Sequence, residues 1–548
     1  MSKRPNILFI MADQLRADYL GCYGHETIRT PNLDRLARSG VRFSRAYCQS
    51  TVCGPSRMSF YTGRYVGSHG ATWNDTPLAV GEMTLGDHLA ATGYRTVLVG
   101  KTHMRADEAG MARLGIQQGS TTGQRIAECG FEPELREEGI YNIVGDQSRH
   151  ANAPYNQWLK EHGYEGDNPW HTAANSVTID GKRTSGWYLD ASPHPANVAA
   201  EHSETAYLTE EAIACIDRLG SADPWCIHLS YIKPHWPYIA PAPYHAMYDA
   251  DAIQKPQRHE RERTSPHPVY AAFQNLRVSQ AFSDDAVREA VIPAYMGLVS
   301  ELDDHIGKLL AALEVRNLLD DTIIVFTSDH GDYLGDHWLG EKDFPHEPSI
   351  RIPLIIRGPG LAEGHVSDAL VEAIDCVPTF VDFAGGDAEH PRLEGRSLTP
   401  MLLGYDVEEW RETAFSEYDY SVLRVRDEVG QPIDRANFVT AVTERYKLIH
   451  FPGMSPMLFD LHDDPEELRD LGDDPDHAHV RELLTGQILD WSLRPRRVTE
   501  SSAAIERRTD TQIERGILLG LRDEADHADA LAAERARGAE RLAKAGPV

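Results

Sequence analysis

An alternation of short apolar runs and helical patterns, sustained over about 400 residues, is the feature that most constrains this fold. Apolar runs of this kind are typical of strands buried on both faces of a parallel sheet. They lie at residues 6–12, 95–100, 225–232, 322–327 and 352–357, with helical patterns between them at 32–39, 84–92, 206–219 and 294–314. The alternation predicts an α/β fold with a doubly wound mixed sheet and helices on both faces.

Length and local composition predict three regions. The 548 residues exceed the size at which one hydrophobic core usually stops growing. We expect a catalytic domain over 1–408, with an insertion at about 104–201 that covers the active site, because this stretch is long, polar and aromatic. Strand-like segments indicate a small α+β domain over 409–494. In residues 495–548, the spacing of the apolar side chains predicts a helical extension. Its apolar face carries Ile513, Ile517, Leu518 and Leu521.

The net charge and the N-terminal residues limit the classes of partner and the location that we expect for this protein. The chain has 54 basic and 84 acidic residues, a net charge of −30, which argues against nucleic acid or an anionic membrane as the main partner. The apolar run at 6–12 is followed by Asp13 and is too short for a signal peptide or a spanning helix. We therefore expect a cytoplasmic protein in which a local basic cluster attracts any anionic substrate.

Two polar pairs follow predicted strands. They are Asp13-Gln14 and Asp329-His330, and open α/β sheets bind ligands at the carboxyl ends of their strands. Three carboxylate or amide oxygens and one imidazole suit Ca²⁺, Mg²⁺ or Mn²⁺ better than a structural zinc. Either pair alone has a structural alternative, because Asp and His after a strand also form turns and caps.

Cys53 stands in the sequence Cys53-Gly54-Pro55-Ser56-Arg57. The residues at 56–65 lack proline and carry apolar side chains at helical spacing, so Cys53 is expected at a helix N-terminus, where anions are favoured. The alternative is a small buried cysteine before a helix. The seven cysteines are scattered and odd in number, and they indicate neither a disulfide framework nor a zinc site.

Taken together, the motifs resemble those of type I sulfatases in the alkaline phosphatase superfamily. In chain order they are Asp13-Gln14, Cys53-Gly54-Pro55-Ser56-Arg57, Gly100-Lys101-Thr102-His103, Lys233-Pro234-His235, Ser328-Asp329-His330-Gly331 and Lys342. The resemblance extends from Asn6 to about Leu471 and is strongest to the branch of arylsulfatases and phosphonate monoester hydrolases. Lys101 and His103 depart from the phosphonate-cleaving members, which lack them, and match typical sulfatases.

The resemblance implies two cofactors. In type I sulfatases, Cys-x-Pro-x-Arg is the signal for a formylglycine-generating enzyme, so Cys53 would become formylglycine. One hydroxyl of its hydrate attacks the substrate, and the other remains available to expel the product. A divalent metal, Ca²⁺ or Mn²⁺ ahead of Mg²⁺, would be held by Asp13, Gln14, Asp329 and His330.

Further roles follow from the same resemblance. Arg57 would hold the oxygens of the nucleophile, and Asn74 would contact the substrate. The other roles are charge neutralisation at the sulfuryl group by Lys101 and Lys342, protonation of the leaving group by His235, and cleavage of the sulfated hemiacetal by His103 acting as a base.

These residues predict an arylsulfatase-like hydrolase of sulfate monoesters, with phosphonate monoesters and phosphodiesters as side substrates. A phosphonate monoester hydrolase or phosphodiesterase with the same apparatus is the nearest alternative. A choline-sulfatase-like specificity and a non-catalytic binding protein on a sulfatase scaffold are the others. The apolar face of the extension, together with the resemblance, predicts a homodimer or homotetramer.

Overall fold

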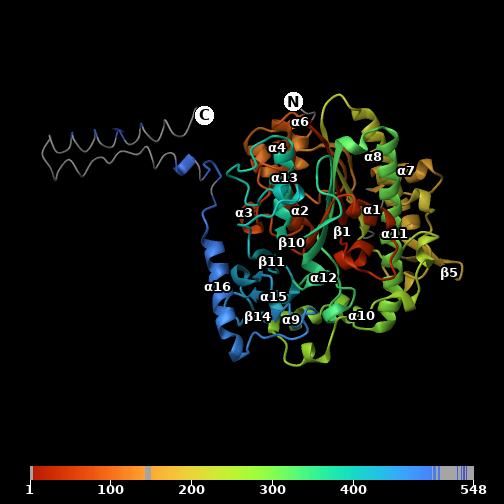
Figure 1. Cartoon of the computed structure of the whole chain (residues 1–548). Coiled ribbons are helices and arrows are strands. Elements are labelled where there is room, and N and C mark those ends of the chain that lie inside the picture. Colours follow the sequence, from red (N-terminus) through yellow and green to blue (C-terminus); the bar gives the residue numbers. More distant parts are fainter. Residues whose placement is uncertain are drawn as a thin grey trace. The chain divides into compact units, whose positions relative to one another are not determined.

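The structure is a computed structural model that describes residues 4–141, 150–496, 498–501 and 504–506, with isolated positions between 528 and 539 (Figure 1). It divides into two compact units, one of residues 1–388 and 393–494 and one of residues 389–392 and 495–548. The predicted apolar face of the extension, Ile513, Ile517, Leu518 and Leu521, lies outside the described residues.

An eight-stranded sheet forms the centre of the larger unit, in the order β10-β2-β9-β8-β1-β7-β3-β4. β9 runs antiparallel to both of its neighbours, and the other pairs are parallel, so the sheet is mixed as predicted. The strands are β1 (Asn6–Asp13), β2 (Val41–Tyr47), β3 (Arg95–Gly100), β4 (Glu132–Arg136), β7 (Trp225–Pro234), β8 (Thr322–Ser328), β9 (Arg351–Arg357) and β10 (His365–Glu372).

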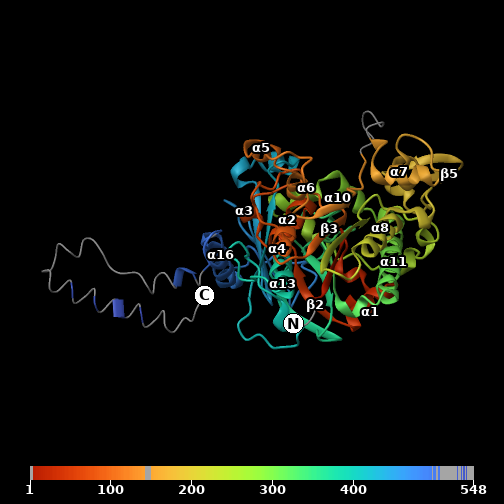
Figure 2. The ribbon, with the colours of Figure 1, turned by 90° about the horizontal axis from the view of Figure 1, so that it is seen from above.

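Both faces of the sheet are covered, because the side chains of β1 alternate between two cores. Leu8 and Ile10 belong to one hydrophobic cluster, and Ile7 and Phe9 belong to the other. Figure 1 shows the helices of the two faces on opposite sides of β1, and Figure 2 shows them on opposite sides of β3. One face carries α1 (Pro31–Arg38), α8 (Glu204–Leu219) and α11 (Asp285–Val315), and the other carries α2 (Cys53–Thr62), α4 (Leu85–Ala91) and α13 (Cys376–Phe383).

Residues 104–201 contain more regular structure than expected. β4 joins the edge of the central sheet beside β3, and Tyr155 and Trp170 are buried in the same cluster as α8 and α11. Much of this segment is therefore part of the main core. Its other elements are α5 (Glu108–Arg113), α6 (Thr121–Ala127), α7 (Pro154–Glu161) and the hairpin of β5 (Ser176–Ile179) and β6 (Lys182–Ser185).

A second, antiparallel sheet follows the main one, which matches the smaller α+β region predicted. Its strands are β11 (Ala414–Asp419), β12 (Asn437–Val442), β13 (Tyr446–His450) and β14 (Met457–Asp460). Val480, Leu484 and Ile488 of α16 (Ala478–Leu493) share a core with this sheet. The remaining helices are α3 (Val66–His69), α9 (Pro268–Gln274), α10 (Arg277–Phe282), α12 (Glu347–Ile350), α14 (Thr399–Leu402) and α15 (Arg424–Val429).

Within the described part of the chain, the helices are all too short or too polar to cross a lipid bilayer.

Candidate active site

The two polar pairs meet because their strands are neighbours. β1 and β8 are parallel, with Ala12 beside Ser328, so the residues that follow them lie at the same edge of the sheet. The backbone of Gln14 turns sharply with a φ of 63°, and its N–H donates to Asp329 Oδ1 at 3.0 Å. This left-handed turn carries the Gln14 side chain towards the same site as the carboxylates.

Cys53 is the first residue of α2, as the sequence predicts, and the helix is buried along its whole length. Asn74 fixes this end of the helix, because its Oδ1 accepts a hydrogen bond from the N–H of Gly54 at 2.8 Å. A Cβ atom at Gly54 would also lie 2.8 Å from that oxygen, so the glycine permits the close approach.

The Cys53 sulfur lies close to a histidine, a lysine and a carboxylate. Sγ lies 3.1 Å from His330 Nε2, 3.2 Å from Lys342 Nζ and 3.7 Å from Asp13 Oδ1. Burial raises the pKa of the thiol, but Lys342, His330 and Lys101 outweigh burial and hold the pKa well below its ordinary value. Any oxyanion built at this position would meet the same positive charge.

Two buried cations neutralise the carboxylates. Arg57 lies one helical turn after Cys53, and its guanidinium contacts Asp329 Oδ2 at 2.9 Å and Asp13 Oδ2 at 3.2 Å. Lys101 Nζ lies 2.6 Å from the same Asp13 oxygen. Burial and Cys53 raise the pKa of Asp13, but Lys101 and the other cations outweigh them and lower it. Arg57 therefore binds the carboxylates of the predicted metal site in addition to lying near the nucleophile.

Lys342 connects Gln14 and His235. Its Nζ donates to Gln14 Oε1 at 2.9 Å and lies 3.2 Å from His235 Nε2. His235 Nδ1 lies 2.7 Å from the carbonyl oxygen of Trp236, so Nδ1 carries the proton and Nε2 accepts from Lys342. Burial and Lys342 lower the pKa of His235 to about 4. The imidazole is therefore neutral at pH 7. Burial lowers the pKa of Lys342, but Cys53 and Asp13 outweigh burial and raise it, so the ammonium beside the imidazole stays protonated.

His103 also lies within hydrogen-bonding reach of the Cys53 side chain. Its backbone has a φ of 53°, and its N–H donates to both oxygens of Glu138 at 3.2 Å. Nearby, Thr102 Oγ1 donates to Glu128 at 2.9 Å, which is a structural contact. Glu138 thus holds the turn that presents His103.

The donor atoms fit a divalent cation. One atom each from Asp13, Cys53, Asp329 and His330 lie within 4.8 Å of one another. His330 Nδ1 donates to the Gly331 carbonyl at 2.9 Å, so Nε2 is the ring nitrogen that can bind a metal when the imidazole is neutral. Gln14 Nε2 is bound to Asp332 at 2.5 Å, which turns Oε1 towards Lys342 and the site. Oxygen-rich donors of this kind suit Ca²⁺, Mg²⁺ or Mn²⁺.

The eleven site residues predicted from the sequence lie close together in the structure. The sequence did not predict the residues that hold them in place. Ser230 Oγ accepts from Arg57 at 2.7 Å, and Tyr238 donates to Asp332 at 2.6 Å. Asp332 directly follows the Asp329-His330-Gly331 motif, so its position in the sequence could have indicated that it lies near the site. Ser230, Tyr238 and Glu138 carry no such signal, because only folding brings them to the site.

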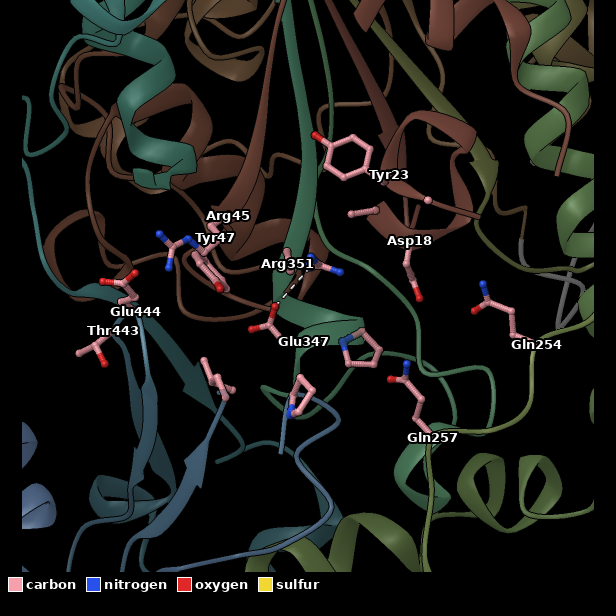
Figure 3. Close-up of a pocket in the computed structure, with 15 residues that line it drawn as sticks. Asp18, Tyr23, Arg45, Tyr47, Gln254, Gln257, Glu347, Arg351, Thr443 and Glu444 are labelled. Carbon is pink, nitrogen blue, oxygen red and sulfur yellow. Dashed lines mark ion pairs between the residues drawn. The ribbon is translucent and has the colours of Figure 1, made fainter. Parts of the chain in front are cut away.

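A separate cavity of about 400 Å³ lies between the central sheet and the second sheet (Figure 3). None of its lining residues belongs to the candidate site. Two ion pairs involve its lining residues: Glu347 lies 3.3 Å from Arg351, and Asp18 lies 2.6 Å from Arg16.

Comparisons with known proteins agree with this geometry. A family model described as Sulfatase matches residues 5–386, and one described as N-sulphoglucosamine sulphohydrolase, C-terminal, matches residues 335–493. The chain is 31% identical to the multifunctional alkaline phosphatase superfamily protein PehA of Trinickia caryophylli, over 89% of this chain and 95% of that protein. It is 28% identical to an arylsulfatase of Clostridium perfringens, over 85% and 90%. The solved phosphonate monoester hydrolase SpPMH of Silicibacter pomeroyi matches with a TM-score of 0.78 and 32% identity, over 89% and 95%.

Proposed function

Because the chain belongs to the sulfatase family and is a hydrolase of sulfate or phosphonate esters, we propose that its main substrates are sulfate monoesters. The nucleophile is a formylglycine made from Cys53 by a formylglycine-generating enzyme. Phosphonate monoesters and phosphodiesters are side substrates.

The observation that supports this proposal is the ring of positive and proton-transferring groups around Cys53. Lys342 lies 3.2 Å from Sγ, and Lys101 is held in the site by its 2.6 Å contact with Asp13. His103 and His235 flank the nucleophile. Two lysines match the charge spread over the oxygens of a sulfuryl group, and two histidines allow separate proton transfers for bond formation and bond cleavage.

The chain's own residues divide the proposed reaction between them. Lys101 and Lys342 hold the sulfuryl oxygens while one formylglycine hydroxyl attacks the sulfur. The neutral His235 takes the proton that this hydroxyl loses and gives it to the leaving oxygen as the bond between sulfur and that oxygen breaks. His103 takes the proton of the second formylglycine hydroxyl, so that sulfate leaves and the aldehyde returns. A divalent metal held by Asp13, Gln14, Asp329 and His330 would supply Lewis-acid stabilisation of charge on oxygen.

A phosphonate monoester hydrolase is the second candidate. The observation that favours it is the similarity to SpPMH along almost the whole of both chains. Both substrates present a tetrahedral anion to the same cations. The two candidate functions therefore use the same site residues and differ in which ester is hydrolysed with the higher kcat/KM.

Two measurements test the proposal. Mass spectrometry of the tryptic peptide that contains Cys53 should show conversion of the thiol to the aldehyde or its hydrate in an active preparation. The kcat/KM for an aryl sulfate should then exceed that for the phosphonate monoester with the same aryl group. The opposite order would make the phosphonate ester the main substrate, and an active preparation with wholly unmodified Cys53 would reject the formylglycine mechanism.

A further inference from the structure

A second cavity in the main unit is lined mainly by aromatic and apolar side chains. Its volume is about 740 Å³, which is the size of a site for a drug-sized organic molecule and far exceeds what a sulfuryl group fills. Trp187 and Tyr188 come from the segment before α8, and Val278 and Phe282 come from α10. The other lining residues are Gly186, Leu189, Asp190, Trp236, Pro237, Tyr238, Arg277, Ala281 and Glu341.

Three residues that line this cavity are chain neighbours or hydrogen-bond partners of residues in the candidate active site. Trp236 follows His235 in the chain, and their rings are 4.4 Å apart. Glu341 precedes Lys342, whose Nζ contacts Cys53 Sγ. Tyr238, a third lining residue, accepts a hydrogen bond from Gln14 Nε2 at 3.2 Å. The groups that would hold the ester and the walls of the cavity are therefore carried by the same two short loops.

One wall of the cavity carries an acidic residue, Glu341. Glu341 is half-buried, and among the described residues its carboxylate has neither an ion-pair nor a hydrogen-bond partner. Trp187 and Trp236 pack close to each other nearby, with ring centroids 5.2 Å apart. Asp190 and Arg277 also line the cavity, but both are exposed to solvent, where their fields are screened.

We infer that this cavity binds the organic group of the ester substrate, and that Glu341 makes it select neutral or cationic aromatic groups over anionic ones. The inference rests on the proposed ester hydrolysis and adds the class of leaving group. Aromatic faces and an unpaired carboxylate both attract an organic cation. An anionic substituent in the same space would be repelled by Glu341, and the exposed Arg277 would offset this repulsion weakly, because solvent screens its charge.

Aryl sulfates that differ only in a remote substituent can test the selection. The set consists of 4-(trimethylammoniomethyl)phenyl, 4-ethylphenyl and 4-(carboxymethyl)phenyl sulfates, in which the methylene insulates the reacting oxygen from the charge. Burial raises the pKa of Glu341 to about 7, so the assay runs at pH 8, where the carboxylate is ionised. We expect the kcat/KM of the cationic ester to exceed that of the carboxymethyl ester by about tenfold or more.

Glu341→Gln keeps the shape of the side chain and removes its charge. It should lower the ratio of the cationic to the anionic ester by about fivefold or more, mainly through KM. Glu482→Gln, on the exposed side of α16, removes the same charge elsewhere and should leave the ratio unchanged. Val278→Glu adds a further carboxylate to the cavity, beside Glu341 and Asp190, and should raise the ratio, which provides a test of opposite sign if Glu341→Gln folds poorly.

The outcomes separate this inference from the proposed function. Hydrolysis of all three esters at similar rates in the wild type, or a ratio unaffected by both cavity variants, would overturn the role of Glu341 while leaving the sulfatase reaction intact. Preference for the carboxymethyl ester, lost in Arg277→Gln, would overturn it in favour of Arg277. If none of the sulfate esters or their phosphonate counterparts is cleaved, the proposed function itself fails.

Discussion

At the scale of single residues, the site is built from charges that each need a partner. Arg57 is fully buried and lies between Asp13 and Asp329, and Lys101 adds a second cation to Asp13. A buried carboxylate without such partners would be protonated and would bind metal poorly. The charge balance of the site therefore prepares it for both a metal ion and an anionic substrate.

The first residue-scale prediction concerns Cys53. Cys53→Ala should abolish turnover, because no nucleophile remains. Cys53→Ser should give at most a single slow turnover, because a serine ester lacks the second hydroxyl that expels the product. Burst kinetics with an aryl sulfate, together with the intact mass of the variant, measure both effects. Sustained turnover by Cys53→Ser would contradict the mechanism.

The second prediction concerns Asp329. Asp329→Asn keeps the shape of the side chain but removes a charge that contacts Arg57 at 2.9 Å. We expect kcat/KM to fall by about 10² or more, and the content of bound Mn²⁺ or Ca²⁺ after dialysis to fall with it. Asp332→Asn is the matched control, because Asp332 reaches the site only through Gln14 and should lose less metal. Wild-type metal content in Asp329→Asn would remove it from the ligand set.

At the scale of elements, the ends of β1 and β8 and the start of α2 position the candidate site. The long helix α11 carries a buried acidic residue. Glu301 of α11 is 1% exposed. Burial raises its pKa from 4.5 to about 7, although Lys233 opposes this. The native state therefore holds this proton more tightly than the unfolded chain does, so stability falls as pH rises between these two values.

Glu301→Gln removes this pH dependence. Relative to the wild type, the variant should gain about 1–2 kcal/mol in the free energy of unfolding between pH 5 and pH 8. Urea unfolding at the two pH values, followed by circular dichroism, measures the difference. Glu314→Gln on the same helix is the control, because Glu314 is exposed and should show little change. A parallel pH dependence in Glu301→Gln and the wild type would show that Glu301 ionises normally.

At the scale of the whole molecule, the predicted homodimer or homotetramer stays a prediction. Its proposed contact, the apolar face at Ile513, Ile517, Leu518 and Leu521, lies outside the described residues. We expect light scattering to give a multiple of the 61.1 kDa chain mass, and removal of residues 495–548 to reduce it. A full-length monomer at micromolar concentration would exclude the oligomer. An unchanged oligomer after removal would place the contact elsewhere, for instance on the exposed Leu489 and Leu493 of α16.

The sequence by itself determined the α/β class, the buried strands and the residues grouped around Cys53. Strands buried on both faces are continuous apolar runs, so β1, β3, β7, β8 and β9 were visible without any tertiary information. The β2 and β10 strands were not, because they are partly exposed near one edge of the sheet and carry polar residues among the apolar ones. Motifs at strand ends were readable because their order along the chain places them at one edge.

Only the tertiary structure decided how these groups work together. Arg57 and Lys101 share one oxygen of Asp13, and Lys342 lies between Gln14 and His235. The aromatic cavity beside Glu341 joins loops from distant parts of the chain. Periodicity reports which face of an element is buried, whereas hydrogen-bond partners, pKa values and cavities depend on side chains that meet only after the sheet has formed.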